Sequence, residues 1–229
     1  MSSLQQILDF LEQDPVTHFE ALYHLKHGQE ATRFWFDEPS FLIELPSAKK
    51  FFLGGDPTGA SALLHHLEFP NYLVHTFSPL LPSLKHLFTV REVQLNFVYT
   101  LQTQDFYPQP DARVRPLIPR GFPISYNVGE EKISLETFYG LFLEDQLVCY
   151  GGTQFEDEEW AEIAWLRTEE AHQRRGYGVK VVSAIVEDLL RERKKPVYRV
   201  TADNVSSRRL AEKLGFNLHS EFLYVTVRR

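Results

Sequence analysis

Apolar residues recur with helical spacing at the start of the chain. Leu4, Ile7, Leu8 and Leu11 lie on one helical face, so the pattern predicts an amphipathic helix over residues 4–11 that stops before Pro15. Further elements expected before residue 110 are helices over 16–26 and 61–67 and strands over 33–36, 40–45, 50–53 and 93–101. The first half of the chain is therefore predicted to be a mixed α+β domain.

The pattern sharpens after residue 140. Apolar segments at 141–143 and 147–151 flank the polar pair Glu144-Asp145 and predict a hairpin, and alternation over 161–168 predicts a third strand. A helix over 179–194, a strand over 197–201 and a helix from an Asn204 cap to Gly215 follow. This order predicts a mixed, mostly antiparallel, twisted sheet flanked by helices, so the fold class is α+β (mixed α/β).

Three prolines between Tyr107 and Pro116 predict a connector, which divides the chain into domains 1–110 and 111–229. The formal net charge is −7, and it is unevenly distributed. Residues 1–110 carry 6 basic against 12 acidic side chains, whereas residues 111–229 carry 18 against 19. The basic residues that a phosphate-rich ligand needs are therefore concentrated in the second half.

Composition excludes several classes of protein. The acidic balance argues against a nucleic-acid partner, and no apolar run approaches the ~18 residues of a membrane span. The lone Cys149 rules out an internal disulfide framework and favours a cytoplasmic location. His24 and His27 have a spacing that suits metal ligands but no evident third ligand, so no metal site is predicted. The oligomeric state is left open.

A glycine-containing turn, His172-Gln-Arg-Arg-Gly-Tyr-Gly178, leads directly into the helix at Val179. Glycines at this point let the backbone approach a ligand and expose consecutive amide groups, and a helix N-terminus carries about half a positive charge. Two arginines stand beside it. The turn is therefore suited to a pyrophosphate, although an ordinary strand-to-helix loop has the same outline.

The string Gln173-x-x-Gly176-x-Gly178, followed by Asn204 and Leu210-Ala-Glu-Lys-Leu-Gly-Phe216, resembles the GNAT superfamily of acyl-CoA-dependent N-acyltransferases. The resemblance covers about residues 140–217. It implies that acetyl-CoA is the cosubstrate, with its pantetheine arm along the strand end and its pyrophosphate on the turn; Asn204 and Ser207 either contact the coenzyme or cap the last helix. The coenzyme-binding residues implied are Leu166, Arg167, Thr168, Gln173, Arg174, Arg175, Gly176, Tyr177, Gly178, Val179, Asn204 and Ser207.

The same resemblance suggests how an amine loses its proton. Glu162 stands 14 positions before Gly176, like the catalytic glutamate of the histone acetyltransferase branch, and is expected to be the general base. Glu169, Glu170 and His172 are fallbacks. Many members have a tyrosine proton donor in the last helix, where this chain has Ala211, so the general acid is unassigned; Tyr177 and Tyr224 are candidates, and water is an alternative.

The expected function is transfer of an acyl group, most simply acetyl, from acyl-CoA to a primary amine by direct attack in a ternary complex. The acceptor is a small molecule or a peptide, and residues 1–110 are expected to wall one side of its site, as a diverged second lobe of the same fold. Two alternatives remain. The protein is a non-catalytic acyl-CoA-binding regulatory module, or it is a protein acetyltransferase whose N-terminal domain provides targeting.

Overall fold

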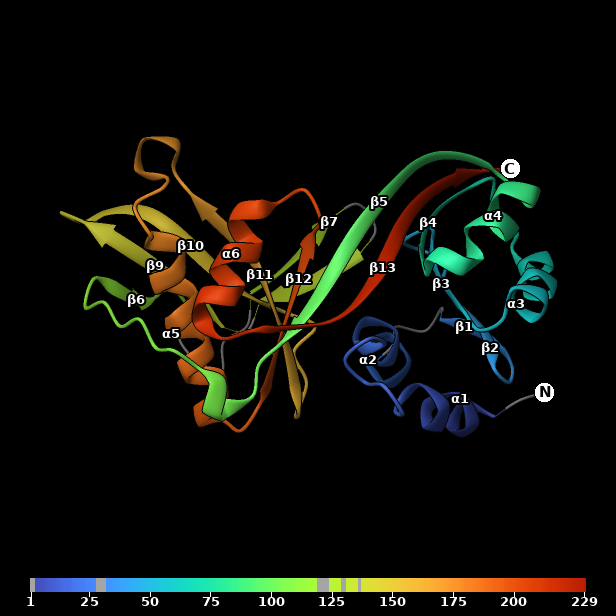
Figure 1. Ribbon diagram of the computed structural model, residues 1–229, viewed down its shortest axis with the longest axis horizontal. Coiled ribbons are helices and arrows are strands. Elements are labelled where there is room, and N and C mark those ends of the chain that lie inside the picture. The colour runs from blue at the N-terminus through green and yellow to red at the C-terminus, as the bar shows by residue number, and fades with distance from the viewer. Residues whose placement is uncertain (1–2, 28–31, 119–123, 129–130, 136) are drawn as a thin grey trace. The chain divides into compact units, whose positions relative to one another are not determined.

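The computed structural model describes residues 3–27, 32–118, 124–128, 131–135 and 137–229 (Figure 1). Its contacts divide the chain into two compact units. The first comprises Met1–Phe97, Gly129–Glu131 and Ser220–Arg229, and the second comprises Val98–Val128 and Lys132–His219. The last ten residues therefore return to the unit in which the chain begins.

The first unit has helices on both faces of a mixed sheet. Its helices are α1 (Leu4–Leu11), α2 (Phe19–His27), α3 (Pro57–Leu63) and α4 (Leu81–Leu87), with 3-10 turns at Leu64–His66 and Ser78–Leu80. Its strands are β1 (Arg33–Asp37), β2 (Ser40–Leu45), β3 (Lys50–Gly54), β4 (Asn71–Thr76) and parts of β5 (Thr89–Thr100) and β13 (Asn217–Arg228). Strands β1, β2 and β3 are antiparallel, β3 and β4 are parallel, and β13 runs antiparallel to β4.

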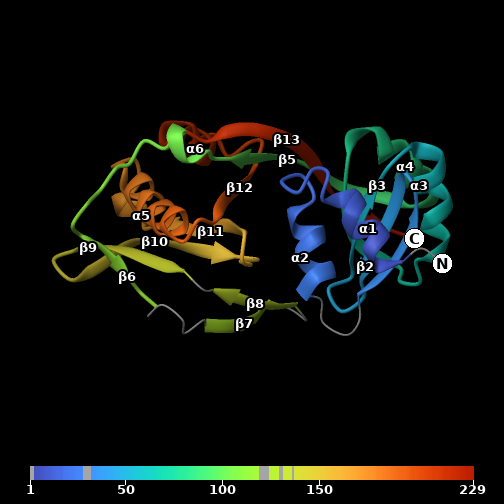
Figure 2. The same ribbon diagram turned by 90° about the horizontal axis from the view of Figure 1, so that it is seen from below.

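The alternation of strand side chains produces two cores in this unit. Ile43 of β2 packs with Ile7 and Leu11 of α1, whereas its neighbour Leu42 packs with the α3–α4 side of the sheet, including Leu84. Figure 2 shows α1 and α2 on one side of β2 and β3, and α3 and α4 on the other. Since both faces are covered, every residue of β2 and β3 is buried.

The second unit carries the predicted coenzyme-binding segments. It contains β6 (Val114–Pro116), β9 (Phe138–Leu143), β10 (Gln146–Gln154), β11 (Trp160–Thr168), α5 (Tyr177–Arg191), β12 (Lys195–Thr201) and α6 (Val205–Leu214), with 3-10 turns at Thr103–Asp105 and Glu170–His172. β7 (Ile124–Val128) and β8 (Glu131–Leu135) pair as a separate two-stranded sheet.

In this unit the strand order β12-β11-β10-β9-β6 is antiparallel except for the parallel pair β11 and β12. The helix α5 joins those two strands and lies against β9, β10 and β11 (Figure 2). Its apolar stripe, which includes Val182, Ile185 and Leu189, is fully buried. The predicted fold class, a mixed and mostly antiparallel sheet flanked by helices with a further α+β unit, is confirmed.

The structure places the division between the units elsewhere than the predicted 110/111 boundary. The first unit ends at Phe97, inside the continuous strand β5. The proline-rich stretch belongs to the second unit, because its backbone is held there: Tyr107 N donates to Leu214 O at 3.1 Å, and Gln109 N donates to Ser183 Oγ at 2.8 Å. Prolines interrupted the local pattern without marking the edge of a compact unit.

Candidate functional site

Strands β11 and β12 pair only over their first residues and then diverge. Their parallel register runs from Trp160↔Lys195 to Ile163↔Tyr198. Burial changes at the same place, since residues 160–163 are buried and the following residues of β11 are partly or largely exposed. Beyond Ile163, the edge of β11 that faces β12 is therefore no longer paired with that strand, and the chain continues toward the glycine turn.

A β-bulge coincides with this divergence. Tyr150 pairs with Arg167 and Gly152 pairs with Ala164, so Gly151 of β10 faces two residues of β11. One of these, Trp165, has a left-handed φ of 59°. Such a conformation in a bulky residue costs of order 1–3 kcal/mol and is concentrated at functional sites. The bulge re-aims the strand exactly where a cavity opens, which marks this segment as a candidate site.

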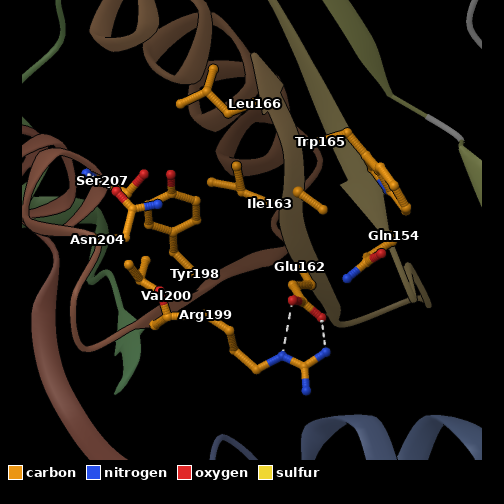
Figure 3. A pocket seen from close by; sticks show the side chains of 12 residues that line it. Gln154, Glu162, Ile163, Trp165, Leu166, Tyr198, Arg199, Val200, Asn204 and Ser207 are labelled. Carbon is orange, nitrogen blue, oxygen red and sulfur yellow. Dashed lines mark hydrogen bonds and ion pairs between the residues drawn. The ribbon is translucent and has the colours of Figure 1, made fainter. Parts of the chain in front are cut away.

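Two neighbouring cavities occupy the space between the diverging strands and the helices. The first, of about 340 Å³, is lined by β11 and β12, with Glu162 and Tyr198 among its residues (Figure 3). The second, of about 470 Å³, is lined by the glycine turn and by one face of α6. Leu166, Asn204 and Ser207 line both cavities. An extended ligand can therefore run from the turn to the strand gap.

The glycine turn is built for close approach by an anion. Gly176 is the N-cap of α5 with a left-handed φ of 77°, and a Cβ added there would meet no atom within 4 Å. Gln173 Nε2 donates to the Thr168 carbonyl at 3.2 Å, which ties the turn to the end of β11. The first turn of α5 contains no acidic residue. The amide groups at the N-terminus of α5 are therefore not occupied by a carboxylate from the first turn of the helix.

Basic side chains surround this cavity. Arg174 comes from the turn, whereas Arg209 and Lys213 come from α6, four residues apart on one helical face. Sequence reasoning missed this pair, although its i, i+4 spacing was the available signal. Of the predicted coenzyme-binding residues, ten line the cavity; Arg167 and Arg175 are outside its lining. The donor set suits a phosphate-rich ligand.

Asn204 has a capping function in the structure. Its Oδ1 accepts a hydrogen bond from Ser207 N at 3.1 Å, and the helix ends at Gly215, whose φ is 97°. The predicted cap at both ends of α6 is thus confirmed. Because Asn204 and Ser207 also line both cavities, capping does not exclude contact with a ligand.

Glu162 lies in the strand gap, paired with an arginine that sequence reasoning did not find. Arg199 Nε donates to Glu162 Oε1 at 2.9 Å, and Nη2 donates to Oε2 at 2.5 Å. Both side chains are nearly buried, with exposed fractions of 5% for Glu162 and 10% for Arg199. A forked pair of this kind holds the carboxylate in one orientation and favours its ionised form. Two lone-pair directions of the carboxylate are thereby occupied.

The candidate proton donors are distributed differently from the expectation. Tyr177 lines the cavity at the glycine turn, with the Arg113 guanidinium 5.6 Å from its ring centroid. Tyr224 belongs to the first unit, where its hydroxyl donates to Glu20 Oε2 at 3.0 Å. Ala211 is fully buried. Tyr198, on β12, is the cavity tyrosine that sequence reasoning overlooked.

Acidic residues of the turn before β11 have structural partners. In the acidic turn, Glu156 pairs with Lys194 at 2.6 Å, Glu159 pairs with Lys195, and Asp157 Oδ1 accepts from Trp160 N at 2.7 Å. No group of three or more potential metal ligands occurs among the residues whose placement is described. Within those residues, no helix is long and apolar enough to cross a membrane.

Comparison with known proteins gives one family match. Residues 138–225 match the family model described as FR47-like protein. No curated protein matches the chain in sequence.

Several solved structures share the fold. A Drosophila protein has a TM-score of 0.73 at 13% identity, over 98% of this chain and 95% of its own. A GCN5-related N-acetyltransferase from Kribbella flavida has a TM-score of 0.60 at 11% identity, over 100% and 96% of the two chains. A tandem GNAT protein from the clavulanic acid biosynthesis pathway has a TM-score of 0.59 at 11% identity, over 98% and 94%.

The fold, with its diverging parallel strands β11 and β12, has the architecture of GNAT acetyltransferases. The FR47-like match falls on the segment that carries the resemblance read from the sequence, and the solved GNAT structures share the fold, so that resemblance is confirmed for this segment and for the fold.

Proposed function

We propose that the protein is an N-acetyltransferase that transfers an acetyl group from acetyl-CoA to a primary amine within a ternary complex. The observation that carries the proposal is the pair of cavities joined at Leu166, Asn204 and Ser207. They connect an anion-binding helix terminus to a buried carboxylate through the gap between β11 and β12. A phosphate-rich thioester and an amine need that combination.

The coenzyme would be held mainly by backbone groups. The amides from Arg174 to Val179 would bind the pyrophosphate, and Arg209 and Lys213, which line the same cavity, would supply positive charge. Backbone groups of residues 166–168 on the released edge of β11 would bind the pantetheine arm as an added strand does. Arg167 and Arg175 would contribute through the backbone or at the rim, since they lie outside the cavity lining.

Glu162 would remove the proton that the acceptor amine loses. Arg199 donates one hydrogen bond to each of its oxygens, and the amine would pass its proton to this carboxylate directly or through one water. The arginine would keep the carboxylate ionised and fixed before the acceptor arrives. Direct attack is favoured because Cys149, the only cysteine, is buried beside Thr168, and burial raises the pKa of its thiol.

The first unit is proposed to be a diverged lobe of the same fold. Its chain order is β1-β2-β3, α3, β4, α4, β5, and the second unit repeats this order as β9-β10-β11, α5, β12, α6, β13. In each, three antiparallel strands are followed by a helix and then by a strand parallel to the third. The likeness of the whole chain to a tandem GNAT protein supports this proposal.

The test is release of free thiol from acetyl-CoA in the presence of a broad panel of amines. Glu162→Gln should lower kcat about 10²-fold or more, because it removes a general base while preserving shape. Glu212→Gln is the matched control, since Glu212 is exposed on α6. If the wild type binds coenzyme A but turns over no amine, the enzymatic proposal fails in favour of a non-catalytic coenzyme-binding module. If Glu162→Gln retains full activity, Glu162 is not the base.

A further inference from the structure

Tyr198 stands at the point where the strands separate. It is the last residue of β12 in the parallel register, opposite Ile163, and it is 4% exposed. Its side chain lines the cavity between the strands together with Asn204 and Ser207 of α6 (Figure 3). The ring is therefore placed at the junction of the two cavities, where the phosphate-binding end gives way to the strand gap.

Tyr198 and Arg199 point to different sides of this gap. Successive side chains of a strand alternate, and Figure 3 shows Tyr198 directed toward Asn204 and Ser207 and Arg199 directed toward Glu162. The gap therefore has a carboxylate on one side and a phenol on the other. An amine entering on the Glu162 side would attack a thioester whose sulfur lies on the α6 side.

The phenol carries its proton in this position. Burial raises the pKa of Tyr198, and a side-chain hydrogen bond with Ser207 opposes that rise. A neighbour that lowers a phenol's pKa stabilises the phenolate, so Ser207 would support a negative charge on the Tyr198 oxygen.

The other candidates lie elsewhere. Tyr177 is in the first turn of α5, at the phosphate end. Tyr224 donates to Glu20 in the first unit. Position 211 of α6 is a fully buried alanine, which has no proton to donate. Of the described residues that line the strand gap, only Tyr198 is a tyrosine.

We propose that Tyr198 of β12 is the proton donor to the departing thiolate, replacing a donor that α6 lacks. This inference rests on the proposed acetyltransferase function. The amine nitrogen forms a bond to the thioester carbonyl carbon and passes its proton to Glu162 or water. The carbon–sulfur bond then breaks, its electron pair goes to sulfur, and the sulfur takes the proton of Tyr198. The phenolate, held by Ser207, recovers a proton from solvent.

The test is Tyr198→Phe, which keeps the ring and removes only the hydroxyl. With acetyl-CoA and the best amine of the panel, kcat at neutral pH should fall about 10–100-fold, while the KM for acetyl-CoA changes less than about threefold. The difference in kcat between the wild type and Tyr198→Phe should become smaller at high pH. The wild type loses its proton donor as the phenol ionises, whereas the variant never had one. Ser207→Ala should move this high-pH fall in wild-type activity, the basic limb of the pH profile, to higher pH.

Tyr139→Phe is the matched control. It removes another tyrosine hydroxyl of the same unit, one that bonds Asp188 away from both cavities, and it should lower the melting temperature without changing kcat. Calorimetry with coenzyme A verifies that each variant is folded. If Tyr198→Phe retains activity within threefold, or loses it by one factor at every pH, Tyr198 is not the donor. If Tyr198→Phe does not fold, an unshifted limb in Ser207→Ala overturns the inference. Absence of turnover by the wild type refutes the proposed function and this inference with it.

Discussion

Replacing Gly176 by alanine isolates the conformational requirement of the glycine turn, the proposed binding site of the coenzyme pyrophosphate. The residue has a φ of 77° and a ψ of 8°, and an added Cβ would lie in open space. No clash therefore contributes to the cost of the substitution. What remains is the penalty for a left-handed residue with a side chain, about 1–2 kcal/mol.

That energy must appear in one of two measurements. If the turn keeps its shape, the free energy of unfolding falls by about 1–2 kcal/mol. If the turn relaxes to a negative φ instead, stability is retained but the amides after Gly176 no longer converge. The loss then appears as a roughly 5–30-fold weaker affinity for coenzyme A, since 1.4 kcal/mol corresponds to a factor of ten. The two losses together should equal the conformational penalty.

Urea unfolding and calorimetric titration with coenzyme A measure both quantities. Gly176→Asn should cost less than Gly176→Ala, because asparagine tolerates the left-handed region. Gly215→Ala is the comparison, since Gly215 is also left-handed but its added Cβ would lie 1.8 Å from the Asp105 carbonyl oxygen. It should lose more stability than Gly176→Ala. An alanine at 176 that changes neither stability nor affinity would refute the assigned geometry of the turn.

Two further predictions concern a partly buried histidine and a helix cap. Burial lowers the pKa of His18 to about 4, below its usual 6.5. Between pH 6.5 and pH 4 the unfolded chain therefore binds a proton that the folded chain does not, so the free energy of unfolding decreases as the pH is lowered. We expect about 2 kcal/mol less stability at pH 5 than at pH 7 from this residue; His18→Phe should remove that slope in urea unfolding, whereas His86→Gln, at an exposed position, should keep it. Asn204→Ala should cost about 1 kcal/mol through the lost cap. Asn204→Asp should retain the cap yet weaken coenzyme A binding in calorimetry, and unchanged affinity would show that Asn204 does not face the ligand.

The elements that the sequence predicted best are those fixed by local chemistry. The hairpin between β9 and β10 turns at Glu144 and Asp145, and both have left-handed φ values, 47° and 69°. A two-residue turn of this type suits the twist of its strands, so the polar pair was sufficient to locate it. The cap and the terminal glycine of α6 are equally local signals.

The parts that the sequence did not reveal depend on contacts distant in the chain. Trp165 is left-handed because β11 must bulge against Gly151, a conformation that the side chain of tryptophan does not favour. Arg199 meets Glu162 only after α5 has brought β12 beside β11. No local sequence pattern could therefore show that Glu162, the expected general base, is paired with Arg199.

The two proposed lobes differ at the N-terminus of the helix that follows their third strand. In the first unit, Asp56 caps α3 and its Oδ1 accepts from Thr58 N at 2.9 Å and Gly59 N at 3.1 Å. These backbone hydrogen bonds hold the pKa of Asp56 below its usual range, so the cap remains anionic. A helix terminus whose amides already bind an internal carboxylate does not need, and electrostatically opposes, an external phosphate.

In the second unit, the equivalent position is Gly176, and the charge comes from basic side chains around the cavity. The N-terminus of α3 is therefore capped by its own carboxylate, whereas that of α5 has no side-chain cap and would remain open to the proposed coenzyme. The acidic excess of the chain lies in residues 1–110, whereas the basic side chains around the cavity belong to the second unit. The difference in capping assigns the single coenzyme molecule of the proposed reaction to the turn before α5.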